Sequence, residues 1–177
     1  MLKKIAIASS ILAVSSTLSF ASSAPYLGIG LGLTNNTAGT SNYRGIPFTI
    51  SGGYGATVDQ NVYLAGEIFA NLGTATLNNN PGGVSLRTTY SYGLSFIPGL
   101  MLSDHAMMFI RLGVIKTRFS SLNSNATTGG QAGLGLQTSV TQNWDVRGEY
   151  DYTSYRRVGG ASPRSDAFNI GLVYKFE

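Results

Sequence analysis

The chain has 177 residues, of which 11% are charged, and its formal net charge is +4. Ordinary soluble proteins carry about 25% charged residues, so this composition is unusual for a water-facing surface. Cysteine is absent, which excludes disulfides and thiolate metal sites. Beyond the N-terminal region no apolar run reaches the about 18 residues that a spanning helix needs. Any membrane crossing would therefore be made by strands whose apolar character falls on alternate positions.

The first 21 residues have the composition of a secretory signal peptide. Two lysines precede an apolar run, and small residues around Ala21 suit a signal peptidase. Cleavage after Ala21 is preferred to cleavage after Ala24, because Pro25 would adjoin the second cut. Removing residues 1–21 leaves 156 residues (177 − 21), which is enough for one domain at 22–177. The two lysines leave with the peptide, so the net charge falls from +4 to +2.

Alternation of apolar and polar residues predicts eight strands along the rest of the chain. These strands cover residues 26–34, 46–56, 62–72, 86–101, 108–115, 132–140, 144–153 and 167–177. Polar, glycine-bearing connections at 35–45, 73–85, 120–130 and 154–166 read as long loops, and the other three connections read as short turns. Pro98 argues against regular pairing near the end of the fourth strand. Nothing is left over for a second domain.

Long and short connections alternate along the predicted strand order. With an even number of strands both termini lie on one side, where an exported chain begins. The short turns are therefore expected in the periplasm and the long loops outside the cell.

The period of the pattern does not decide which face is outside, because a soluble barrel of the lipocalin type also alternates. A soluble barrel needs charges on its outer face, whereas the polar face here is mostly Gly, Ser, Thr and Asn, which suits a crowded interior. The apolar face also concentrates aromatic residues near strand ends, as in the interfacial belts of membrane barrels, although aromatic residues are enriched in strands generally. The expected belts are Tyr54, Phe96, Trp144, Tyr174 and Phe176 at the periplasmic rim, and Phe48, Tyr90, Tyr92, Tyr152 and Phe168 at the outer rim.

Seven charged residues fall on the predicted inward face. They are Glu67, Arg87, Arg111, Arg147, Glu149, Asp151 and Lys175. The interior of an eight-stranded barrel is just wide enough for side chains, so these groups must pair or hold trapped water. A structural ion-pair network that plugs the lumen is the first interpretation, and a gated conduit for ions or protons is the second. Large inward residues such as Phe69 and Phe109 favour the plugged lumen.

Six other basic residues are candidates for contacts with lipopolysaccharide or another ligand. They are Arg44, Lys116, Arg118, Arg156, Arg157 and Arg164. Lys116 and Arg118 face outward at the loop end of the fifth strand, where a cation costs about 0 to 1 kcal/mol rather than the roughly 2 to 4 kcal/mol of mid-bilayer. The set could bind lipopolysaccharide phosphates or acidic host glycans by charge-assisted hydrogen bonds, or it could merely neutralise an anionic surface. It forms no contiguous patch with a recognition element for nucleic acid.

Catalytic and cofactor sites have little support in the sequence. The single histidine, His105, lies in a predicted turn beside Asp104, and the strand order brings together no Ser, His and carboxylate. The glycine-rich run 28–32 is not followed by the helix that a nucleotide fingerprint requires. We therefore expect no enzyme activity, no metal and no cofactor.

The runs Gly133-Leu134-Gly135-Leu136 and Arg147-Gly148-Glu149-Tyr150-Asp151-Tyr152, with Asn143 and the aromatic last strand, resemble the small outer-membrane β-barrel family. This family includes the OmpA transmembrane domain, OmpX and the opacity-type surface proteins. The resemblance covers the whole mature chain. It departs at Glu177, because the family usually ends on the aromatic residue itself. The peptidoglycan-binding domain of full-length OmpA is absent, so a cell-wall anchor is not implied.

The resemblance implies an all-β, eight-stranded, antiparallel up-and-down transmembrane barrel in the bacterial outer membrane. It implies assembly by the barrel-assembly machinery, and the last strand would carry the signal for it. That signal would consist of Phe168, Ile170, Leu172, Tyr174 and Phe176. The expected role is structural and surface-interacting, with membrane integrity and adhesion to host surface molecules through the loops, by a monomer surrounded by outer-membrane lipids. A small, passive, porin-like diffusion channel is the alternative, and a lipid-modifying enzyme is a distant third.

Overall fold

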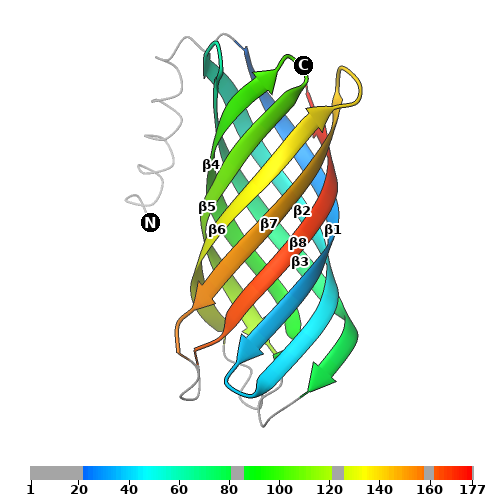
Figure 1. The fold of residues 1–177 in the computed structure, drawn as a ribbon, viewed down its shortest axis with the longest axis vertical. Coiled ribbons are helices and arrows are strands. Elements are labelled where there is room, and N and C mark those ends of the chain that lie inside the picture. The colour runs from blue at the N-terminus through cyan, green and yellow to red at the C-terminus, as the bar shows by residue number, and fades with distance from the viewer. Residues whose placement is uncertain (1–21, 81–85, 121–125, 158–161, 177) are drawn as a thin grey trace, which may run out of the picture.

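The computed structural model describes residues 22–80, 86–120, 126–157 and 162–176. Eight antiparallel strands close into a barrel, in which each strand pairs with its neighbours in the chain and β1 pairs with β8 (Figure 1). The strands are β1 (Ser22–Ala38), β2 (Ser41–Asp59), β3 (Val62–Asn80), β4 (Thr88–Ser103), β5 (Ala106–Phe119), β6 (Ala126–Ser139), β7 (Trp144–Tyr155) and β8 (Arg164–Lys175). The predicted fold class is thus confirmed. The predicted signal peptide and Glu177 lie outside the described residues.

The described part of the chain contains no helix that is long and apolar enough to cross a membrane.

The two ends of the barrel differ in their connections. Short turns at residues 60–61, 104–105 and 140–143 lie at one end, which we call the turn end and which is uppermost in Figure 1. The turn at Gly39 and Thr40 lies at the opposite end, which we call the loop end, together with the last residues of β3, β5 and β7 and the first residues of β4, β6 and β8. Gly39 has a φ of 59°, a left-handed conformation that a tight turn requires and that glycine adopts at little cost.

The predicted long loops were too long. Of residues 35–45 only Gly39 and Thr40 lie outside a strand, and β3 continues through residues 73–80, which were expected to be a loop. The strands β6 and β8 likewise start earlier than predicted, at Ala126 and Arg164. In these segments apolar residues no longer alternate with polar ones, although the backbone hydrogen bonds between the strands continue. A strand segment that faces neither lipid nor the core needs no apolar face to remain paired with its neighbour.

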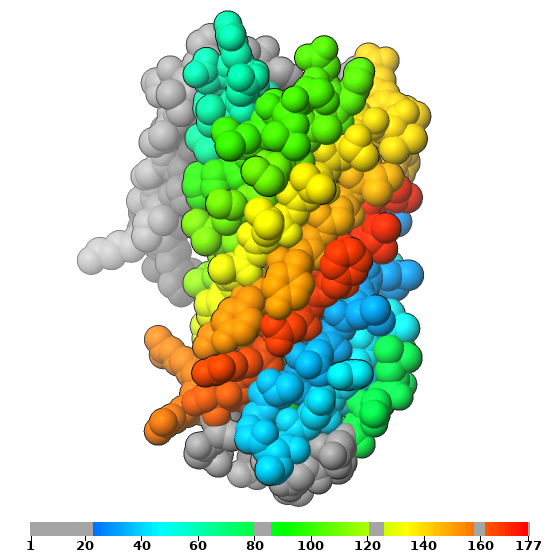
Figure 2. Space-filling model, in the orientation of Figure 1, coloured from blue at the N-terminus to red at the C-terminus, as the bar shows by residue number. Residues whose placement is uncertain are grey.

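The outer face of the barrel is apolar. Every second residue of β1 from Leu27 to Leu33 is 52 to 56% exposed, and the same holds for alternate residues around the wall. The strands cross this surface obliquely, with β7, β8 and β1 side by side in Figure 2. The residues of both predicted aromatic belts point outward. At the turn end Tyr174 packs edge-on against Trp144 and Phe176, and its ring centroid lies 5.0 and 4.9 Å from theirs. Pairing between β4 and β5 skips Ile97 and Pro98, as expected for a residue without an N–H.

Large interior side chains lie across glycines of the neighbouring strand. Three cross-strand pairs show this arrangement: Tyr26 with Gly53, Phe69 with Gly93 and Phe109 with Gly135. A Cβ atom added at any of these glycines would overlap the facing ring. Glycine on the inner face therefore lets each ring lie along the wall and fill the lumen sideways.

We expect Gly135→Val to lower the free energy of unfolding by about 1 to 3 kcal/mol, because Phe109 must leave its position. The matched control is Gly148→Val, since a Cβ atom at Gly148 meets nothing within 4 Å. The measurement is urea unfolding of the barrel in lipid vesicles. Equal effects of the two substitutions would contradict the overlap argument.

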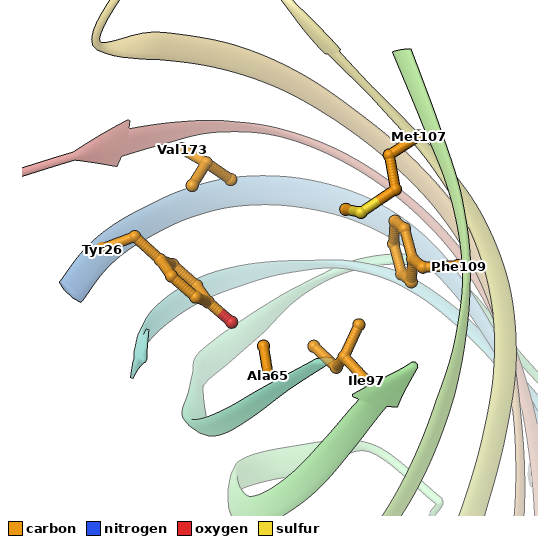
Figure 3. Close-up of a cluster of buried hydrophobic side chains, with 6 residues drawn as sticks. All are labelled: Tyr26, Ala65, Ile97, Met107, Phe109 and Val173. Atoms are coloured by element: carbon orange, nitrogen blue, oxygen red, sulfur yellow. The ribbon is translucent and has the colours of Figure 1, made fainter. Parts of the chain in front are cut away.

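An apolar cluster occupies the half of the lumen nearer the turn end. Its members come from β1, β3, β4, β5 and β8 and are Tyr26, Ala65, Ile97, Met107, Phe109 and Val173 (Figure 3). Met107 and Phe109 project from one strand, and the Tyr26 ring reaches toward them from the opposite wall. This apolar cluster fills the lumen on the turn-end side of the charged groups of the interior.

Candidate functional site

Glu67 is held between two arginines in the middle of the lumen. Its Oε1 lies 2.8 Å from Arg111 Nη1 and its Oε2 lies 2.6 Å from Arg147 Nη1. The three side chains are 1, 4 and 8% exposed. Tyr26 also donates a hydrogen bond from its hydroxyl to Glu67 Oε2 over 2.9 Å. Both carboxylate oxygens thus have charged donors, which a buried carboxylate needs if it is to remain ionised.

Arg111 also binds the carboxylates of β7. Its Nη2 lies 2.9 Å from Glu149 Oε2, and its Nε lies 3.7 Å from Asp151 Oδ1. Asn169 donates to the other oxygen of Asp151 over 2.9 Å. We call Glu67, Arg111, Arg147, Glu149 and Asp151 the central layer. It contains three carboxylates and two guanidinium groups, all of them predicted to face inward.

Aromatic rings support the guanidinium groups of the central layer. Arg111 lies 5.6 Å from the centroid of the Phe69 ring, and Arg147 lies 5.4 and 5.3 Å from those of Tyr26 and Phe109. Such contacts favour a cation over the face of a ring, more so when water is excluded. The apolar cluster and the central layer therefore form one packed block of side chains across the lumen.

Lys175 lies outside the central layer. It pairs with Asp145 over 3.0 Å near the turn end, and its side chain is 33% exposed. Gln137 links this pair to the layer, because it accepts from Arg147 Nε over 2.8 Å and donates to Asp145 Oδ2 over 2.6 Å. Sequence reasoning omitted both Asp145 and Gln137 from the network, although their inward positions on β7 and β6 could have shown them.

The prediction that Arg87 faces the interior is wrong. Arg87 precedes β4 and its side chain is exposed, whereas Leu86 is 2% exposed and points inward. The pairing of β4 with β5 shifts register between Thr88 and Tyr90. A bulge there reverses the inward and outward positions on its far side, and the regular alternation of the sequence contains no sign of it.

Two cavities lie on either side of the central layer. The cavity toward the loop end is about 90 Å³, room for a few water molecules, and the charged residues of the central layer line it. The cavity at the turn end is about 170 Å³ and is lined by residues that include Tyr63, His105 and Lys175. Tyr26, Glu67 and Arg147 contact one another across the lumen and separate the two spaces. Among the described residues no three His, Asp or Glu side chains are placed to hold a metal ion.

The loop end is also filled by side chains. Phe119 of β5 and Tyr155 of β7 meet edge-on with ring centroids 5.3 Å apart. Nearby, Asn36 of β1 donates to the Leu86 carbonyl over 2.9 Å, a contact between opposite walls. The lumen is thus obstructed at the loop end as well as at its centre.

The six predicted ligand-binding basic residues all lie at the loop end, in two groups. Five of them are exposed and Arg118 is half-buried. The first group consists of Arg156 and Arg157 just after β7, Arg164 at the start of β8 and Arg44 near the start of β2. The second group lies on β5, where Lys116 and Arg118 are the cross-strand partners of Tyr92 and Tyr90, and the exposed Arg87 adds to it.

The loop end is strongly basic. Outside the lumen, the described residues of this end carry the seven basic side chains just named and one acidic side chain, Asp166. Asp166 accepts a hydrogen bond from the Tyr150 hydroxyl over 2.6 Å. The described acidic residues Asp59 and Asp104 lie instead at the turn end.

The five residues predicted to form the assembly signal lie at the end of the chain on the outer face. Phe168, Ile170 and Leu172 are exposed on β8, and Tyr174 is half-buried between its two aromatic neighbours. Phe176 follows the end of β8 and donates from its backbone N–H to the Pro25 carbonyl over 3.0 Å.

Residues 5–176 match the family described as the outer membrane protein beta-barrel domain. The chain belongs to this family. It is a barrel of the bacterial outer membrane, as the resemblance predicted, and its apolar outer face therefore lies against lipid. A search of curated proteins finds no match.

Solved structures of similar fold include two small surface barrels. Neisserial surface protein A (NspA) is 19% identical, with a TM-score of 0.66 over 88% of this barrel and 99% of that chain. Ail, the attachment invasion locus protein of Yersinia pestis, is 16% identical, with a TM-score of 0.59 over 86% of this barrel and 98% of that chain. Ail in complex with the heparin analogue sucrose octasulfate is also similar, at 17% identity and a TM-score of 0.55 over 87% and 99%. At these identities the likeness shows the fold.

Proposed function

We propose that this protein is a closed outer-membrane barrel that contributes to membrane integrity and binds anionic groups at the cell surface through its loop end. The observation that carries the proposal is the central layer, because a lumen blocked by paired charges leaves the outer surface as the place for function. Seven basic side chains beside one acid at the loop end then favour phosphate or sulfate groups, which accept charge-assisted hydrogen bonds.

The orientation belongs to the same proposal. The loop end faces outward and the turn end faces the periplasm, as in related barrels with short periplasmic turns. The leader is cleaved after Ala21, which the pairing of Ala24 with Gly55 supports, since a cut after Ala24 would remove paired residues of β1. The barrel-assembly machinery recognises the aromatic last strand, and the barrel acts as a monomer and not as an enzyme.

The heparin analogue bound to Ail supports a sulfated ligand as one form of the anionic group. Lipopolysaccharide phosphates offer the same chemistry from within the membrane. We expect each of the two basic groups to bind a different one of these ligands. Lys116 and Arg118 face lipid beside Tyr92 and Tyr90 and suit headgroup phosphates, whereas Arg156, Arg157 and Arg164 suit a ligand in solution.

We expect Arg156→Gln, Arg157→Gln and Arg164→Gln together to weaken heparin binding at least about tenfold, because one lost charged hydrogen bond already costs roughly 1.5 kcal/mol. Lys116→Gln with Arg118→Gln should leave heparin binding unchanged but weaken co-purification of lipopolysaccharide. Surface plasmon resonance on nanodisc-embedded barrel and phosphate analysis of bound lipid are the two measurements. Unchanged heparin affinity in the triple variant, together with unchanged lipopolysaccharide content in the double variant, would refute a role for these basic residues of the loop end.

The second candidate function is a small passive diffusion channel. The two cavities favour it, because together they occupy both sides of the central layer. A channel requires that Tyr26, Glu67 and Arg147 part to connect them, and conductance measurements decide between the two functions.

A further inference from the structure

The strand β3 extends beyond its neighbour β4 at the loop end. Its pairing with β2 continues to Asn42 and Asn80, but its pairing with β4 stops at Leu72 and Tyr90. Within the described ranges, residues 73–80 therefore have β2 on one side and no strand on the other. Figure 1 shows this end of β3 projecting from the wall as the green arrowhead at the lower right. No other strand of the described barrel leaves so long an edge unpaired.

A bulge separates the free edge from the barrel wall. Gly73 has a φ of 71°, and the register of β2 and β3 shifts between Pro47 and Thr49, opposite this glycine. A bulge with a left-handed glycine bends its strand and increases its twist. It turns β3 away from β4 at the residue where their pairing ends.

The edge lacks most of the protection that natural edge strands carry. Residues 73–80 read Gly-Thr-Ala-Thr-Leu-Asn-Asn-Asn, without a charge or a proline, which are the usual means of blocking strand addition. Residues 75–79 are exposed. Eight residues of strand measure roughly 26 Å, enough for several main-chain hydrogen bonds to an added strand.

We propose that the β3 edge from Gly73 to Asn80 binds an extended, acidic segment of a partner polypeptide as an added strand. Main-chain pairing supplies the affinity in such complexes, and the basic loop end supplies the charge preference. Arg87 is exposed just before β4, on the side that the free edge faces, and Arg44 is exposed on β2, which pairs with the other side of this segment at Asn78. The inference rests on the proposed surface function, because the edge must face the outside to meet a partner.

A second copy of the chain does not fit this edge. Two upright barrels in one membrane are related by rotation about the membrane normal, so their facing strands tilt in opposite directions. With a tilt of roughly 35 to 45° for each strand, the two edges would cross rather than run side by side. A flexible segment of a soluble partner has no such constraint.

The test uses the barrel in lipid nanodiscs and three ten-residue peptides. The first alternates valine and glutamate, the second is its fully backbone-N-methylated form, and the third alternates valine and lysine. Hydrogen exchange at the amides of residues 73–80 is measured by NMR. We expect the acidic peptide to slow exchange at the free-edge amides at least tenfold, and the other two to have no effect.

Substitutions on the barrel separate edge pairing from simple attraction. Arg87→Gln should weaken binding of the acidic peptide several-fold, whereas Arg156→Gln, which follows β7 on the opposite wall, should not. The inference fails if amides 73–80 are all protected before any peptide is added, or if the N-methylated peptide protects them equally. Heparin binding is measured on the same sample. Absence of heparin binding would contradict the proposed anion site without affecting the result for the β3 edge.

Discussion

Replacing Arg111 by methionine is expected to lower the free energy of unfolding by about 3 to 5 kcal/mol. Arg111 is the shared partner of Glu67, Glu149 and Asp151, at 2.8, 2.9 and 3.7 Å. Without it, Glu149 has no other ion pair among the described residues, and Glu67 keeps only Arg147. Carboxylates left without a cationic partner in this narrow lumen have lost the solvation of bulk water, and the adjoining cavity has room for only a few water molecules to replace it.

The matched control for this variant is Lys175→Met. Lys175 also pairs with one carboxylate, Asp145, which is only 5% exposed, but the lysine itself is 33% exposed, and Gln137 still donates to Asp145 once the lysine is gone. We expect a loss of at most about 1 kcal/mol. Both are measured by urea unfolding in lipid vesicles, followed through Trp144, the single tryptophan of the chain. Similar losses for the two variants would show that burial does not determine the contribution of these pairs.

The second large effect concerns ion flow through the lumen. In planar bilayers the native barrel should give no conductance above that of protein-free lipid. The triple variant Tyr26→Ala, Glu67→Ser and Arg147→Ser shortens three of the side chains that lie between cavities of about 90 and 170 Å³. It should show discrete openings, because the ion-paired contacts that span the centre of the lumen are then lost, and the contacts at the loop end are the main remaining obstruction.

A lipid-facing variant on the same strands serves as the control for conductance. Leu27→Ala with Ile68→Ala changes exposed side chains of β1 and β3 and should leave the membrane silent. Reproducible openings of the native barrel would instead favour the passive channel, with the central layer as its gate. A silent triple variant would mean that the contacts at the loop end close the lumen by themselves.

The sequence was most informative where a strand has two different faces. The sparse charge of the polar face indicated which residues point outward and the family resemblance implied the closed barrel, while alternation across Phe168 to Phe176 and across β1 predicted the strands. It also placed Glu67, Arg111 and Arg147 inside, on three strands far apart in the chain. That these three meet at one height follows from the register and tilt of the strands, which alternation does not specify.

The errors fall where the two faces are alike or where the period breaks. Residues 73–80 carry Thr and Asn at even positions and Gly, Ala, Leu and Asn at odd positions, so their apolar alternation is too weak to distinguish a paired strand from a loop. Arg87 was assigned to the lumen because the bulge after Thr88 is invisible in the residue types. The free edge of β3 was missed for the same reason, since it depends on how far each neighbouring strand continues.

The contacts of Glu67 also constrain the order in which the barrel can be completed. Its partners come from alternate strands, with Arg111 44 residues and Arg147 80 residues farther along the chain. A sheet of β1 to β4 alone would carry this carboxylate into the bilayer without a counter-charge, at a cost of several kcal/mol. Insertion therefore becomes favourable only when β5 and β7 are in place. The barrel should enter the membrane as a nearly complete sheet, and chains truncated before β7 should remain outside the lipid.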